Sequence, residues 1–266
     1  MASPPVARRI PHDTVVHGES RADDYFWLRD KDDAETAAYL EAENAYADAV
    51  MKPTEALQHR LYEEMLGRIL ETDLSVPYRE GRFLYFARTE QGRQYPTYCR
   101  RPAAGDGPEE VLLDLNEMAR GHDYLSLGAW AVSDDGELLA FSTDTTGFRE
   151  YTLHIKDLRT GLVRAEAIER TGSVAWARDR HVLFYAVEDH AKRPHRVFRH
   201  ALAGGPDALV YEEADERFRV DVGRTRSRDW LVLGSASHTT SEARVLRADD
   251  PEGEWRLIAP RRQGHE

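Results

Sequence analysis

Cysteine is almost absent from this 266-residue sequence, in which Cys99 is the only one. A single cysteine cannot form an intramolecular disulfide or supply a cysteine-rich zinc site. We interpret Cys99 as a small apolar residue of a strand and not as a nucleophile. Because no apolar run follows Arg8 and Arg9, no signal peptide is expected. Both features predict a protein of the reducing cytoplasm.

Long apolar runs are also missing, and no stretch approaches the roughly 20 residues that a membrane-spanning helix needs. Basic residues are scarce, with 36 Lys and Arg against 48 Asp and Glu and a net charge of −12 at pH 7. Nucleic acids and anionic membranes are bound through clustered Lys and Arg. We therefore expect no nucleic-acid and no membrane partner, whereas an acidic chain suits a cationic one.

Several catalytic motifs do not occur in the sequence. The Gly-x-Ser-x-Gly of α/β hydrolases is absent, and Ser20 and Ser126 each lie in only half of such a motif. The metal-binding His-Glu-x-x-His is absent as well. Gly204-Gly205 is typical of a turn rather than of a phosphate-binding loop. We predict no catalytic residue, no metal ligand set and no cofactor in this chain.

Residues 1–72 are predicted to form an extended arm followed by two helices. Prolines at positions 4, 5 and 11 oppose helix formation in the arm, which ends in the aromatic run Tyr25-Phe26-Trp27-Leu28. Apolar residues at helical spacing predict helices over 33–51 and 54–71. We expect both apolar stripes to face a core. The aromatic run needs a surface to pack on.

The ends of the two expected helices carry the usual signals. Asp32 or Asp33 can cap the first helix, and Thr54 can cap the second. Pro53 is expected to separate them, since proline lacks the backbone donor that a helix interior requires.

After residue 72 short apolar runs alternate with turns rich in Gly, Asp and Pro. Four segments align loosely, each with about four short strands at a period near 45 residues, which is typical of β-propeller blades. In the second segment, for example, we expect strands at Trp130–Ser133, Leu138–Ser142 and Tyr151–Ile155. The fold expected is mainly β, a partial propeller of 73–266 with blades near 75–119, 129–165, 173–213 and 218–262.

The sequence resembles the prolyl oligopeptidase family, and within it the oligopeptidase B branch. The resemblance spans nearly the whole chain. The segments that carry it are His12–Gly18 with Asp23–Asp30, Tyr39–Tyr46, Leu61–Ile69, Gln94–Arg101 and Asp144–Leu158. Several long motifs in one order make the resemblance specific.

The resemblance implies an architecture and an activity. Family members join a seven-bladed propeller to an α/β-hydrolase domain, on which the N-terminal arm and helices pack, and the propeller limits access to peptide-sized substrates. Oligopeptidase B enzymes cleave short peptides after Arg or Lys. Their Ser, Asp and His triad lies in the C-terminal half, to which no residue here corresponds. The expectation is a portion with about four of seven blades, without the hydrolase domain and without activity of its own.

An alternative of another class is a stand-alone propeller that serves as a protein-interaction module. The two expected helices argue against it, because simple repeat propellers need no such cap.

Loops on one propeller face are candidates for contact with the hydrolase domain. In a four-stranded blade the loops between blades and those between the second and third strands emerge on the same face. That face is expected to carry Asp123, Arg149, Glu150, His190, Lys192 and Arg193. Asp123, Arg149 and Glu150 are the candidate gating contacts, since charged side chains suit a separable domain interface. The opposite face should carry the turns at 134–136, 159–161 and 204–205.

Overall fold

The computed structural model describes residues 3–105 and 107–265. The chain divides into two compact units, Met1–Leu70 and Glu71–Glu266, which are treated separately below. Within the described residues no helix has both the length and the apolar character needed to cross a membrane.

The first unit consists of an arm and helices. The arm contains the hairpin strands β1 (Asp13–Val16) and β2 (Glu19–Ala22) and the 3-10 turn η1 (Phe26–Arg29). The helices α1 (Ala34–Met51) and α2 (Glu55–Leu66) follow, joined by the 3-10 turn η2 (Lys52–Thr54).

Both helices begin close to the predicted residues, but only the first has the predicted side-chain cap. The Asp33 side chain accepts a hydrogen bond from the backbone N–H of Glu35, so it caps α1. Thr54 is itself in helical geometry, and its hydroxyl donates to the carbonyl of Met51 instead of capping α2. Pro53 lies between α1 and α2, as predicted, in the first turn of η2, where its missing N–H costs little. The predicted end of α2 at residue 71 was wrong, because the helix ends at Leu66.

Much of the apolar stripe of each helix is exposed in this chain, contrary to the prediction that the stripes face a core, while Tyr39, Tyr46 and Leu66 are partly buried. The exposed side chains include Leu40 and Val50 of α1 and Leu57, Leu61 and Met65 of α2. Amphipathic spacing identifies a face that needs a partner, but it cannot say whether the same chain supplies that partner.

The aromatic run of the arm finds part of its packing within the first unit. Phe26 stacks on His12 with ring centroids 3.8 Å apart. Trp27 meets Tyr39 edge-on, and its Nε1–H donates to the carbonyl of Arg8 at 2.9 Å. These contacts tie the arm to α1.

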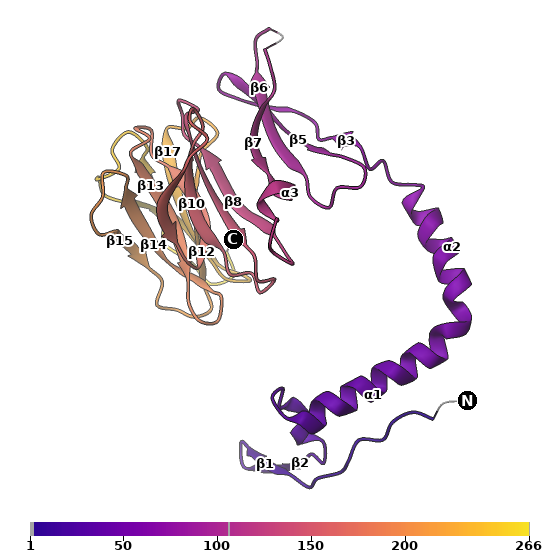
Figure 1. The fold of residues 1–266 in the computed structure, drawn as a ribbon. Coiled ribbons are helices and arrows are strands. Elements are labelled where there is room, and N and C mark those ends of the chain that lie inside the picture. Colours follow the sequence, from indigo (N-terminus) through magenta and orange to yellow (C-terminus); the bar gives the residue numbers. More distant parts are fainter. Residues whose placement is uncertain (1–2, 106, 266) are drawn as a thin grey trace. The chain divides into compact units, whose positions relative to one another are not determined.

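The second unit is built from four antiparallel sheets in chain order (Figure 1). In the first sheet β5 (Phe83–Thr89), β6 (Thr97–Pro102) and β7 (Glu110–Asp114) are adjacent, while the short β3 (Asp73–Leu74) and β4 (Tyr78–Glu80) both pair with β5. A short helix, α3 (Leu115–Met118), follows β7.

Each of the other three sheets has four strands that pair in sequential order. The second sheet contains β8 (Ser126–Val132), β9 (Leu138–Asp144), β10 (Thr152–Asp157) and β11 (Val163–Ile168). The third contains β12 (Thr171–Trp176), β13 (Val182–Glu188), β14 (Pro194–Ala201) and β15 (Ala208–Glu212). The fourth contains β16 (Arg219–Arg224), β17 (Trp230–Ala236), β18 (Ser241–Arg247) and β19 (Arg256–Ala259). The prediction of a mainly β fold with four successive blades of a propeller is confirmed.

The core lies at the seams between consecutive sheets. Tyr85 and Leu139 share the first seam, Ile155 and Trp176 the second, and Phe184 and Leu231 the third. Burial of one such side chain stabilises a fold by about 1.5–3 kcal/mol. Because strands such as β9 bury both faces, each sheet needs its neighbours. The second, third and fourth sheets contact one another through their first strands, β8, β12 and β16.

Candidate functional site

The loop between the second and third strands of the second sheet is held by one buried carboxylate. Asp144, at the end of β9, accepts hydrogen bonds from the Thr146 backbone at 2.8 Å and hydroxyl at 2.6 Å, and from the Arg149 backbone at 2.7 Å. Burial alone would raise the pKa of Asp144, but these hydrogen bonds outweigh it and lower the pKa. Arg149 is therefore presented from a fixed loop, with a left-handed φ of 60°.

The third sheet repeats this arrangement. Asp189 follows β13 and accepts from the backbone N–H groups of Ala191 and Arg193 at 2.9 and 3.0 Å. It also accepts from the Arg193 Nε at 3.1 Å. Burial opposes ionisation, but the hydrogen bonds from Arg193 lower the pKa of Asp189 to about 2. Lys192 has the same left-handed backbone as Arg149, with φ 60°.

These two loops touch. The Lys192 ammonium lies 3.8 Å from a Glu150 carboxylate oxygen and donates to the carbonyl of Phe148. The carbonyl of Lys192 in turn accepts from the Arg219 guanidinium at 2.8 Å. The loops of the second and third sheets and the start of the fourth thus form one continuous charged surface.

The three candidate gating residues lie in this region without forming one cluster. Glu150 and His122 line the same cavity of about 470 Å³. The side chain of Tyr124 packs near Gly147, which brings the segment containing Asp123 beside the loop of Arg149. Asp123 is exposed and makes no hydrogen bond or ion pair among the residues described. Only Glu150 of the three forms an ion pair there, with Lys192.

A larger cavity of about 740 Å³ opens beside Lys192. Its walls come from the loop after β13, the connection between the third and fourth sheets, and the loop after β17. Its charged residues include Asp189, His190, Arg193, Glu216, Arg217, Arg219 and His238. The cavity is therefore a polar hollow suited to charged groups rather than to an apolar ligand.

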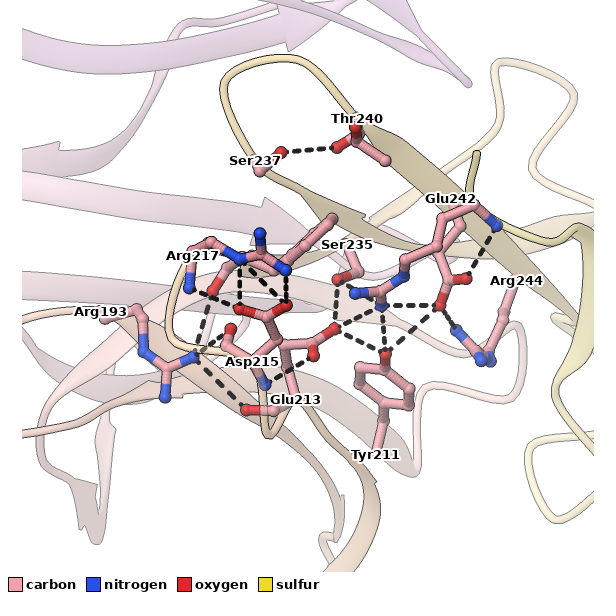
Figure 2. Close-up of polar contacts among 12 residues, drawn as sticks. Arg193, Tyr211, Glu213, Asp215, Arg217, Ser235, Ser237, Thr240, Glu242 and Arg244 are labelled. Carbon is pink, nitrogen blue, oxygen red and sulfur yellow. Dashed lines mark hydrogen bonds and ion pairs between the residues drawn. The ribbon is translucent and has the colours of Figure 1, made fainter. Parts of the chain in front are cut away.

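A buried ion network joins the last two sheets (Figure 2). Arg261 donates to Glu213 at 2.6 Å and to Glu242 at 3.0 Å, and the side chains of the two glutamates are only 6 % and 7 % exposed. Ser235 and Tyr211 also donate to Glu213, at 2.6 and 3.0 Å. The hydrogen bond from Arg261 is the main cause that lowers the pKa of Glu242 to about 2. The same bond raises the pKa of Arg261.

The site has no activated nucleophile among the residues that the structure describes. Ser237 lines the cavity, but its hydroxyl donates to the carbonyl of Thr240 at 3.3 Å, and no histidine is bonded to it. Cys99 is buried in β6, and burial raises the pKa of its thiol to about 11. No group of three or more metal-ligating side chains occurs in the described ranges.

Sequence reasoning did not find the residues that organise this face. Asp144 ends β9 and Asp189 directly follows β13, and each precedes a loop with several polar residues, which was a readable signal. Arg261 had no such signal, because its partners lie 48 and 19 residues away along the chain.

Comparison with known proteins places the chain in a family. Residues 4–266 match the family described as prolyl oligopeptidase, N-terminal beta-propeller domain. The chain belongs to the prolyl oligopeptidase family and comprises sequence of its propeller region.

Within the family, the similarity extends to named peptidases and to solved oligopeptidase B structures. The chain is 37 % identical to Protease 2 of Moraxella lacunata and 39 % identical to dipeptidyl aminopeptidase BI of Pseudoxanthomonas mexicana, each over 98 % of its length. Oligopeptidase B from Trypanosoma brucei superposes with a TM-score of 0.85 at 33 % identity, over 98 % of the chain. The Leishmania major enzyme superposes with a TM-score of 0.88 at 28 % identity, over 99 % of the chain. The resemblance inferred from the sequence is confirmed.

The chain spans about two fifths of the proteins it matches, 39 % of both peptidase relatives and 40 % of both oligopeptidase B chains.

Proposed function

We propose that this chain is the propeller portion of a cytoplasmic serine endopeptidase that cleaves short peptides after Arg or Lys. The observation that carries the proposal is the match to oligopeptidase B structures over nearly the whole chain. Cleavage would proceed through an acyl-enzyme formed by a serine that a histidine activates, in a hydrolase domain outside this chain. The propeller would admit peptides and exclude folded proteins.

The first unit, proposed as residues 1–72, would be the cap that packs on the hydrolase domain. The exposed apolar side chains of α1 and α2, among them Leu40, Leu61 and Met65, support this role. Apolar stripes of this size are costly in water unless another surface covers them. Residues 73–266 would form the gating propeller portion, with blades near 75–119, 129–165, 173–213 and 218–262.

The charged loop face would meet the hydrolase domain. Its support is the fixed geometry of the loops, since Asp144 and Asp189 hold them in place before any partner binds. Asp123, Arg149 and Glu150 would make polar contacts that can open and close, as expected for a separable interface. The acidic character of the chain would favour the approach of basic peptides.

The activity test uses the polypeptide that joins this chain to the proposed hydrolase domain. Matched fluorogenic peptides with Arg, Lys or Pro before the scissile bond are assayed beside a folded protein substrate. The proposal requires cleavage after Arg and Lys and no cleavage of the folded protein. Preference for Pro, or cleavage of the folded protein at a similar rate, would contradict it. The chain of 266 residues alone should be inactive.

The interface test reverses one charge. Arg149→Glu should change kcat or KM for a short peptide by several-fold while the circular dichroism spectrum stays unchanged. Arg159→Glu, in the turn between β10 and β11 on the opposite set of loops, is the matched control. Equal effects of the two variants would argue against the assignment of this face.

A further inference from the structure

A third cavity lies among the first strands of the sheets, away from the charged loops described above. It has a volume of about 520 Å³ and is lined from β4, β8, β12 and β16 and from the turn after β16. Trp130 and Trp176 form part of its wall. Its four arginines are Arg79, Arg224, Arg226 and Arg228.

Two of these arginines are built into the fold. Arg224 has only 10 % of its side chain exposed and donates to both carboxylate oxygens of Asp134, at 2.8 and 3.3 Å. Arg228 pairs with the same Asp134 at 2.8 Å and with Glu80 at 3.0 Å. Two carboxylates therefore face two guanidinium groups.

One donor of this arrangement is left over. The Nε–H of Arg224 is buried and has no hydrogen-bond partner among the described residues. A buried polar group without a partner costs free energy, and the cost is greater for a charged group. This donor belongs to a side chain that lines the cavity.

The other two arginines of the cavity add positive charge without an ion pair of their own among the described residues. Arg79 and Arg226 are exposed, and neither forms an ion pair with a carboxylate in the part of the chain that the structure describes. The cavity therefore holds four guanidinium groups against Glu80 and Asp134, in a chain whose net charge is −12. Such a local excess of positive charge runs against the charge of the whole chain.

We propose that this cavity binds an oxyanion, a carboxylate or a phosphate. The guanidinium fork matches the two oxygens of either group and forms strong charge-assisted hydrogen bonds with them. Arg226 and Arg79 supply exposed guanidinium groups, and Arg224 lines the cavity in a position fixed by its ion pair with Asp134. The proposal does not depend on the peptidase function, since it concerns only residues of this chain.

Calorimetric titration of the full chain tests the proposal. The probes are inorganic phosphate and a short acetylated peptide with a free C-terminal carboxylate, with the amidated form of that peptide as its neutral match. Tryptophan fluorescence serves as a second readout, since Trp130 and Trp176 line the cavity. Saturable binding of phosphate would show that the cavity binds free phosphate. Binding of the acid peptide but not of its amide would show that the cavity binds a peptide carboxylate.

The variants are chosen to avoid unfolding. Arg226→Gln alters an exposed residue and should weaken binding roughly tenfold, the loss expected for one charge-assisted contact. Arg101→Gln removes an exposed arginine of β6 outside the cavity and should leave binding unchanged. Failure of both probes to saturate, or equal binding by wild type and Arg226→Gln, would overturn the proposal.

Discussion

Single buried carboxylates decide the shape of the charged loop face. Asp144 is fully buried and accepts three hydrogen bonds from one loop, which keeps it ionised despite its burial. Two of these bonds come from backbone N–H groups, which would be left without partners if the carboxylate were removed. Hydrogen bonds to charged groups contribute more to stability than neutral ones do.

We therefore expect Asp144→Ala to lower the free energy of unfolding by about 2 kcal/mol, because it removes a charged acceptor and leaves donors unpaired. Urea unfolding at neutral pH measures the change. Asp123→Ala, at an exposed position, should change the value by no more than about 0.5 kcal/mol. A similar small effect of both substitutions would show that the loop does not depend on Asp144.

Arg261 has a comparable role between the last two sheets. Arg261→Met should destabilise the chain by about 3 kcal/mol, because it leaves Glu213 buried without its cation and leaves Glu242 with Arg244 alone. Arg164→Met breaks the surface pair with Glu166 and should cost less than about 1 kcal/mol. Chemical unfolding of both variants measures the difference. A loss for Arg261→Met no larger than that of the control would refute the role of the network.

The same network predicts a dependence on pH. The pKa of Glu242 is lowered to about 2 in the folded chain, so its ionised form stabilises the fold above its ordinary, unfolded pKa. That stabilisation should be lost as the pH falls through the range from about 5 to about 2. Thermal unfolding across this range should show a shallower decline for Arg261→Met than for wild type. Parallel curves would mean that other carboxyls carry the acid sensitivity.

At the scale of elements, turns of one sheet are fitted against the neighbouring sheet. Gly136 lies in the turn between β8 and β9 with φ 74°, and its carbonyl accepts from the Arg100 guanidinium at 2.7 Å. A Cβ at this glycine would approach the ring of Phe83 to 2.8 Å. The position therefore requires glycine for its backbone and for its space.

A matched pair of substitutions separates these two requirements. Gly161→Ala, at φ 75° with no atom near the new Cβ, should cost about 1 kcal/mol for the backbone alone. Gly136→Ala should cost about 1–3 kcal/mol more, because Phe83 must move. Urea unfolding compares the two variants. Equal losses would show that the contact with the first sheet relaxes freely.

At the scale of the whole molecule, the exposed helix stripes should cause association. We expect the chain to self-associate as its concentration rises, because exposed apolar side chains favour contact with one another. Sedimentation velocity over a series of concentrations detects this. Leu61→Glu combined with Met65→Glu should reduce association, while Glu64→Lys on the same helix serves as the control. A chain that stays monomeric at all concentrations would contradict the expectation.

Much of the second unit was predictable because its signals are local. The predicted strand Leu138–Ser142 lies inside β9. The alternation of apolar runs and turns along this unit reflects contacts between neighbouring strands of one sheet. The cap at Asp33 was readable for the same reason, since the residue bonds to the N–H two positions further along. The likeness to oligopeptidase B followed from several such segments in order.

The sequence by itself determined the strands, the turns and the family, because each depends on residues close together in the chain or on a pattern that repeats along it. Only the tertiary structure decided which charged residues meet. Arg261 contacts Glu213 across 48 residues, and Arg228 contacts Glu80 from another sheet. The tertiary structure also decided that the helix stripes are exposed, because burial depends on which surfaces a folded chain brings together and not on the spacing of its side chains.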